Sequence, residues 1–86
     1  MQGTILTLDG LATNRIMLKV QLSAVYYHVV QTDRIDGLVP LALRTRPDLV
    51  ITANRLPDGT AGEVCEALGS VDDLADIPVI AVAPET

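Results

Sequence analysis

The chain has 86 residues, of which 49% are apolar, and a formal net charge of −5. A chain this short forms at most one small domain, and its apolar share is typical of a folded protein and not of a disordered one. The negative charge disfavours nonspecific binding to nucleic acid or to an anionic membrane. A single cysteine, Cys65, excludes an intrachain disulfide and offers no metal-ligand spacing. No apolar run approaches the length of a membrane span, so we expect a cytoplasmic protein by default.

The first part of the chain alternates between a strand pattern and a helix pattern. Residues 4–8 (TILTL) predict a β-strand, which stops at the Asp-Gly turn pair of residues 9–10. Thr13 or Asn14 is expected to cap a helix that runs to about Ala24. Its apolar side chains, which we expect to be covered across a broad stripe, are Ile16, Met17, Leu18, Val20 and Leu22.

Two further strands flank a shorter helix in the middle of the chain. Residues 25–31 (VYYHVVQ) are β-branched and aromatic, and they predict the second strand. Within residues 35–45 the helix is expected to begin near Leu38, because Pro40 is tolerated in the first turn of a helix and not in its interior. Residues 49–53 (LVITA) form an almost unbroken apolar run, which is typical of a parallel strand covered on both faces.

The last part of the chain predicts a turn, a helix and a fourth strand. Residues 54–60 (NRLPDGT) favour the turn, residues 61–68 the helix, and residues 78–83 (PVIAVA) the strand. Strands and helices therefore alternate along the whole chain with short connections. This order predicts a single α/β domain over residues 1–86, with a parallel sheet and right-handed crossovers.

One acidic residue and three segments carry a resemblance to a known family. They are Asp9 at the end of the first strand and the segments ATNRIMLKVQL, PDLVITANRLPDGTAGEVC and IPVIAVAP. Together they resemble the receiver domain of response regulators, the flavodoxin-like, CheY-like phosphoacceptor module of two-component signalling. The resemblance implies a three-layer fold with strand order 2-1-3-4, truncated before the last helix, strand and helix of a receiver. The stretch LSAVYYHV also resembles the N-terminal receivers of diguanylate cyclases that control polar development.

The resemblance implies where a phosphorylation site would lie and which of its groups are missing. In receivers, two acidic residues after the first strand and an acceptor aspartate after the third hold Mg²⁺, while a hydroxyl and a lysine stabilise the phosphoryl oxygens. The matching positions here are Asp9, Gly10, Ala53 and Ala83, and the lysine has no counterpart. The backbone carbonyl of Arg55 is the one further oxygen expected to face the site. The resemblance therefore implies no aspartyl phosphorylation, no cofactor and no Mg²⁺ site, with Asp9 as a vestigial ligand.

Other side chains near the acceptor position are candidates for a substitute acceptor, namely Thr52, Asn54, Asp58 and Thr60. Thr52 directly precedes Ala53, so strand alternation points it to the opposite face of the sheet. Asp58 lies in a Pro-Asp-Gly sequence, which favours a role in the turn over a role in chemistry. Asp9 on its own favours a leftover carboxylate or a helix cap over a metal ligand.

The remaining polar residues favour structural roles. His28 is expected to be a partly exposed strand residue, and Cys65 a small apolar residue packed on the third helix. Arg44 and Arg46 are expected at the solvated end of a helix, where positive charge suits the helix dipole. No glycine-rich phosphate-binding pattern occurs.

Three hypotheses for function follow. The first is a degenerate receiver, or pseudo-receiver, of a phosphorelay signalling protein, which is not an enzyme and acts as an interaction or dimerisation module for a protein partner or an output domain. The alternatives are a receiver with a non-standard phosphoacceptor and a small flavodoxin-like nucleotide-binding protein. Residues 78–83 would end the sheet with an apolar edge. We expect that the chain is a fragment of a longer protein or that a further C-terminal part is not seen. Otherwise we expect two copies to complete one another as a homodimer through this edge, or the chain to aggregate.

Overall fold

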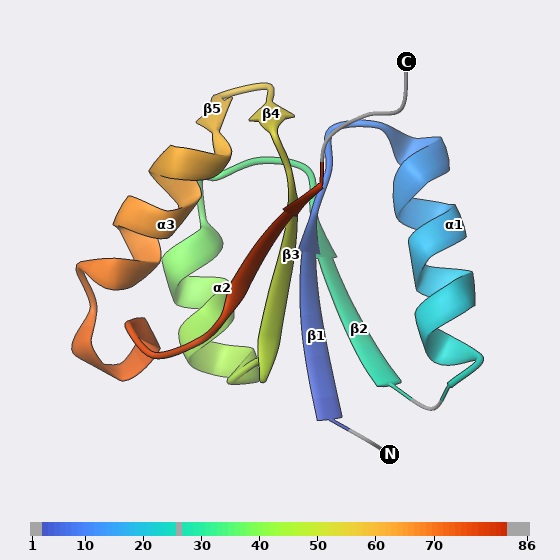
Figure 1. The fold of residues 1–86 in the computed structure, drawn as a ribbon, viewed down its shortest axis with the longest axis horizontal. Coiled ribbons are helices and arrows are strands. Elements are labelled where there is room, and N and C mark those ends of the chain that lie inside the picture. The colour runs from blue at the N-terminus through green and yellow to red at the C-terminus, as the bar shows by residue number, and fades with distance from the viewer. Residues whose placement is uncertain (1–2, 26, 83–86) are drawn as a thin grey trace.

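The chain forms an α/β sandwich in which a parallel sheet lies between helices (Figure 1). The computed structural model describes residues 3–25 and 27–82. In chain order the elements are β1 (Gly3–Leu8), α1 (Ala12–Ser23), β2 (Tyr27–Thr32), α2 (Leu38–Thr45), β3 (Leu49–Ala53), β4 (Arg55–Leu56), β5 (Gly59–Thr60), α3 (Ala61–Gly69), a 3₁₀ turn (Asp72–Leu74) and β6 (Val79–Val82).

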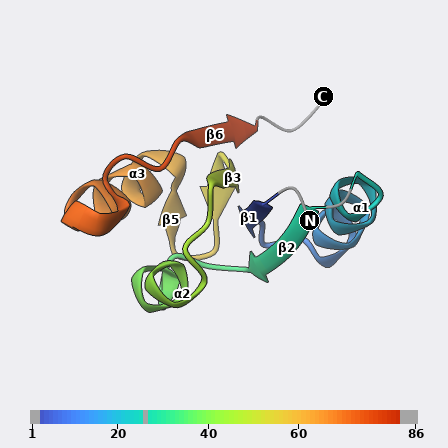
Figure 2. The same cartoon turned by 90° about the horizontal axis from the view of Figure 1, so that it is seen from below.

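The strand order confirms the predicted fold class. The four long strands pair in parallel in the order β2-β1-β3-β6, which is the predicted order 2-1-3-4, because β6 is the fourth strand of this sheet. The short strands β4 and β5 form a separate antiparallel hairpin within the turn predicted for residues 54–60. Helices α2 and α3 cover one face of the sheet and α1 lies on the other (Figures 1 and 2).

The main core lies between the sheet and the pair α2 and α3. Strand alternation sends every second side chain of β1 and β3 to this face, and these residues are almost fully buried. The helices meet them with apolar positions spaced three or four residues apart, as amphipathic helices do. The buried cluster consists of Leu6, Leu8, Leu38, Ala42, Val50, Leu56, Val64, Leu68 and Leu74.

The expectation that α1 is covered across a broad stripe is wrong. No residue of α1 is buried, and Ile16, Met17 and Val20 each expose more than 60% of their surface. The reason is the position of α1, which lies beside β2 and contacts the sheet mainly through that strand. Gln31 of β2 donates from its side-chain amide to the carbonyl of Arg15 in α1 (2.6 Å).

The start of α1 also differs from its prediction. Thr13 and Asn14 lie inside the helix, and Leu11 occupies the N-cap position without a side-chain cap. The carboxylate of Asp9 binds the chain just ahead of the helix instead, because Oδ1 accepts a hydrogen bond from the backbone N–H of Leu11 (2.9 Å). An aspartate two residues upstream thus replaces the expected cap.

The middle of the chain follows the sequence pattern closely. Helix α2 begins at Leu38 as predicted, after Gly37 in a left-handed conformation (φ 83°) that glycine adopts without strain. Strand β3 has its predicted bounds, residues 49–53. Strand β2 begins two residues later than predicted, at Tyr27, and Tyr26 lies outside the described residues.

The predictions for single polar residues had mixed outcomes. His28 lies exposed on β2, and Arg44 and Arg46 lie exposed at the end of α2, as expected. The prediction that Cys65 packs as a small apolar residue is wrong, because it is exposed. On α3 the positions that face the core are Val64 and Leu68, so Cys65 lies on another side of the helix.

A buried hydroxyl on β1 generates a stability prediction. Thr7 is 1% exposed, and among the described residues its Oγ1 has no hydrogen-bond partner. Thr7→Val removes this unsatisfied group while keeping the branched shape, so the free energy of unfolding should rise by about 1 kcal/mol. Urea denaturation followed by circular dichroism measures the change.

The control is Thr52→Val on β3. Thr52 is equally buried, but its Oγ1 donates to the carbonyl of Ala53 (3.0 Å). This variant should lower the free energy of unfolding by about 0.5–1.5 kcal/mol. Equal effects of the two substitutions would contradict the assignment.

Candidate functional site

The carboxyl ends of β1, β3 and β6 meet at one edge of the sheet, where open α/β folds place their sites. Register brings Leu8 beside Thr52, and Ala53 beside Val82. A groove of about 1160 Å³ opens between this edge and α1. Asp9, Gly10, Ala53 and Arg55 all line it, so the structure brings together four of the residues expected at the site. Ala83 lies outside the described residues.

Asp9 lies just before α1, and its oxygen atoms accept hydrogen bonds from the chain that follows it. Its Oδ1 accepts from the backbone N–H of Leu11, and its Oδ2 accepts from the side-chain amide of Asn14 at 3.2 Å. Its backbone carbonyl accepts from Nη1 of Arg15 at 2.8 Å. Both oxygens of this carboxylate therefore already have donors from the chain that follows it.

Gly10, which the resemblance matches to the second acidic position, lies against Pro57 of the β4–β5 hairpin. A Cβ built on Gly10 would come within 3.0 Å of Cδ and 3.2 Å of Cγ of Pro57. Such contacts are tighter than ordinary van der Waals packing, so a side chain here requires the proline ring to move. The position lacks a carboxylate, and the neighbouring proline limits the space for one.

Ala53, which the resemblance matches to the acceptor position, presents a half-buried methyl group. The preceding Thr52 is fully buried, and its register partner Leu8 is a core residue of the α2–α3 face. The predicted alternation of these two side chains is therefore confirmed, because Thr52 is buried beside a core residue of the α2–α3 face. Thr52 is nevertheless among the residues that line the groove.

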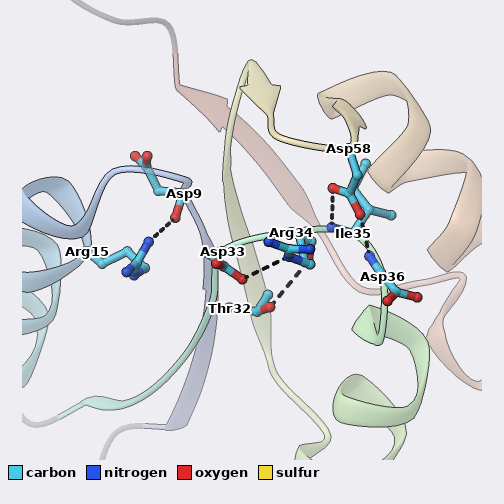
Figure 3. Close-up of polar contacts among 8 residues, drawn as sticks. All are labelled: Asp9, Arg15, Thr32, Asp33, Arg34, Ile35, Asp36 and Asp58. Atoms are coloured by element: carbon cyan, nitrogen blue, oxygen red, sulfur yellow. Dashed lines mark hydrogen bonds and ion pairs between the residues drawn. The ribbon is translucent and has the colours of Figure 1, made fainter.

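Asp58 serves as a tie between two loops, a role that the sequence pattern did not indicate (Figure 3). Its Oδ1 accepts from the backbone N–H of Ile35 and its Oδ2 from that of Asp36, both at 2.8 Å. The hydrogen bond from Ile35 lowers the pKa of Asp58 below its ordinary value, and the N–H of Asp36 and the charge of Arg34 act in the same direction. The predicted turn is present as well, at Pro57 and Asp58 between β4 and β5.

Two further candidates have local structural roles. Thr60 occupies the N-cap position of α3, where its Oγ1 accepts from the backbone N–H of Glu63 at 3.4 Å. Asn54 lies exposed after β3, and its carbonyl accepts from the backbone N–H of Ala61 at 3.0 Å. Within residues 3–25 and 27–82, no three acidic, histidine or cysteine side chains gather in a group able to hold a metal ion. None of the described helices has the length and apolar character to cross a membrane.

No protein-family model and no curated protein sequence matches this chain. Solved structures do match its fold. The signal receiver domain of a signal transduction histidine kinase from Syntrophus aciditrophicus is 28% identical with a TM-score of 0.86, over 98% of this chain and 64% of that one. A response regulator from Desulfuromonas acetoxidans is 26% identical with a TM-score of 0.82, over 93% and 65%. The chemotaxis response regulator CheY4 of Vibrio cholerae is 21% identical with a TM-score of 0.90, over 100% and 72%.

The chain therefore has the fold of response-regulator receiver domains, as its segments indicated. It spans about two thirds of the length of these structures. The likeness to diguanylate-cyclase receivers stays a prediction.

The tie made by Asp58 predicts a pH dependence. Because the pKa of Asp58 is lower in the folded state, its two hydrogen bonds raise the free energy of unfolding at pH values above the unfolded pKa of about 3.9. This contribution is lost as the pH falls through the lower pKa of the folded state. NMR titration should give Asp58 a pKa below 3.8. Below that midpoint, the protection of the Ile35 and Asp36 amides against exchange, relative to their intrinsic exchange rates, should fall.

Asp58→Asn tests the same contacts at neutral pH. The variant should speed amide exchange at Ile35 and Asp36 and remove the acid-induced change in their exchange. Asp76→Asn is the control, because Asp76 is an exposed aspartate outside these contacts. Unchanged protection at Ile35 in Asp58→Asn would contradict the tie.

The contact between Gly10 and Pro57 predicts coupled substitutions. Gly10→Asp should lower the free energy of unfolding by about 1–3 kcal/mol, because the new side chain displaces the proline ring. In a Pro57→Ala background the same change should cost less, with a coupling of at least about 0.5 kcal/mol in a double-mutant cycle. Additive effects would show that Pro57 does not restrict this position.

Proposed function

We propose that this chain, which has the fold of response-regulator receiver domains, is a degenerate receiver that binds a protein partner and is not phosphorylated on aspartate. The observation that carries the proposal is Ala53 at the carboxyl end of β3, inside the groove where the resemblance places the acceptor. A methyl group has no lone pair with which to attack phosphorus. The acceptor chemistry of a receiver is therefore missing at its centre.

The donor set around Ala53 does not fit the Mg²⁺ ion that receivers use. Mg²⁺ takes oxygen ligands in near-ideal octahedral geometry and gives up its water reluctantly. Asp9 supplies one carboxylate, whose two oxygens accept hydrogen bonds at the start of α1, and Gly10 supplies no side chain. With the carbonyl of Arg55 as the only other proposed oxygen, these residues offer too few ligands.

The nearby side chains do not favour a substitute acceptor. The hydroxyl of Thr52 lies in the core face of the sheet, and that of Thr60 accepts from the first turn of α3. Both carboxylate oxygens of Asp58 accept backbone N–H groups, which lower its pKa and its basicity. These contacts support the degenerate receiver over a receiver with a non-standard phosphoacceptor.

The proposed role is therefore an interaction and not an enzymatic reaction. In the described residues, the face that carries α1 leaves Ile16, Met17, Val20, Ile80 and Val82 exposed by half or more of their surface. Exposed apolar residues gathered on one face are typical of a surface that binds another protein. The partner is a protein or a downstream output domain, and the free edge of β6 predicts a homodimer as one form of this binding.

Acetyl phosphate with Mg²⁺ tests the proposal directly. After incubation, the intact mass of the chain should show no added phosphoryl group, while a receiver with a complete acidic site should gain one under the same conditions. Ala53→Asp alone should also stay unmodified, because the Mg²⁺ ligands remain too few. A stable phosphoryl adduct on the unchanged chain, located by fragment mass analysis, would overturn the proposal.

A further inference from the structure

The face of the sheet that carries α1 is only partly covered. In the described residues α1 lies beside β2, while Ile80 and Val82 of β6 remain half exposed on the same face as Ile51 and Ala53. The groove of about 1160 Å³ lies between these strands and the side of α1 that carries Asn14, Met17 and Gln21. Figure 2 shows β6 and α1 at opposite sides of this face. A groove and an exposed apolar helix therefore adjoin on one surface.

The groove carries little charge in an otherwise acidic chain. Of the residues that line it, only Asp9 and Arg55 are charged, and both lie near the carboxyl ends of the strands. Helix α1 carries two basic residues, Arg15 and Lys19, beside its exposed apolar residues. Strands β3 and β6 contain no charged residue, so a helix with the charges of α1 would meet no like charge on them.

The dimensions of the groove suit a helix. Its volume exceeds the roughly 300–1000 Å³ of small-molecule sites. Strands of four and five residues, such as β6 and β3, are about 13–17 Å long, and a helix of 12 residues, such as α1, is about 18 Å long. Residues 83–86 reach at most about 14 Å when fully extended and are too few to fill the space. A helix as long as α1 fits this space better than these residues do.

We propose that a second copy of this chain covers this face, with α1 of each protomer placed over β3 and β6 of its partner. A twofold dimer requires one self-complementary patch, and here the same surface presents both an apolar helix and an apolar groove. The arrangement completes the third layer of the sandwich on both protomers at once. This dimer rests on the protein interaction proposed above, with a second copy of the chain as the partner and the α1 face as the surface.

Sedimentation equilibrium of the 86-residue chain over a range of concentrations tests this proposal. The chain should sediment at twice its monomer mass. Met17→Glu and Ile80→Glu place a charge on the helix and on the strand, and each should weaken the dimer at least about tenfold in its dissociation constant. Both side chains are more than half exposed in one protomer, so the folded monomer should tolerate the charge.

Leu43→Glu is the matched control, because Leu43 is also an exposed apolar residue but belongs to α2, on the other face of the sheet. It should leave the dissociation constant unchanged. A chain that sediments as a monomer would overturn the proposal, and the groove would then be left for a segment of a longer protein or for another partner. Equal weakening by all three substitutions would overturn it too.

Ala81→Pro separates this surface from pairing along the edge of β6. The backbone N–H of Val50 donates to the carbonyl of Pro78. Backbone N–H and C=O groups alternate in direction along a strand, so those of Pro78 and Ile80 face β3 and those of Ala81 face the opposite edge of β6. A proline there removes an edge donor and leaves the β3 ladder intact. Loss of the dimer in Ala81→Pro, with Met17→Glu unaffected, would assign the contact to the edge. Phosphorylation of the chain, in contrast, would overturn the proposed function and leave the dimer standing.

Discussion

The parallel pairing of β1 with β3 is the constraint on which the rest of this structure depends. These strands occupy the centre of the sheet and bury one set of side chains, such as Leu6 and Val50, against α2 and α3. Because the strands are parallel, their carboxyl ends lie at the same edge. Ala53 therefore meets Asp9 and Gly10 in one groove although it lies far from them in the sequence.

Two carboxylates near this edge of the sheet have structural roles in the described residues. Asp9 accepts hydrogen bonds at the start of α1, and Asp58 accepts the backbone N–H groups of Ile35 and Asp36. The N–H groups of Ile35 and Asp36 stabilise the charged form of Asp58 without a metal ion. Pro57 lies against Gly10 and occupies space that a side chain there would need. The loops around the groove are thus held by contacts with one another.

The two faces of the sheet differ in how completely they are covered. The face toward α2 and α3 holds a closed apolar cluster, whereas on the face toward α1 the described residues leave apolar side chains of α1 and β6 exposed. Burial of apolar surface is the main favourable contribution to folding and to association. The apolar side chains that the described residues leave exposed on this face, beside a groove as long as a helix segment, are therefore the feature that points to a protein partner.

The sequence by itself determined the elements and the layout of the sheet. The apolar run of residues 49–53 predicted β3 with its exact bounds, Pro40 placed the start of α2 at Leu38, and alternation placed Thr52 and Ala53 on opposite faces. These features depend on local backbone preferences and on strand periodicity, and both are determined by residues that are close together in the sequence.

Only the tertiary structure decided how these elements are used. The exposure of Cys65, the exposure of the apolar side of α1 and the contacts of Asp58 each depend on which segments meet in space. Asp58 and its donors are separated by more than twenty residues in the sequence, so no local sequence pattern predicts that they meet. An apolar stripe on a helix indicates that this side of the helix favours burial, but whether a neighbour covers it depends on the packing of the whole sheet.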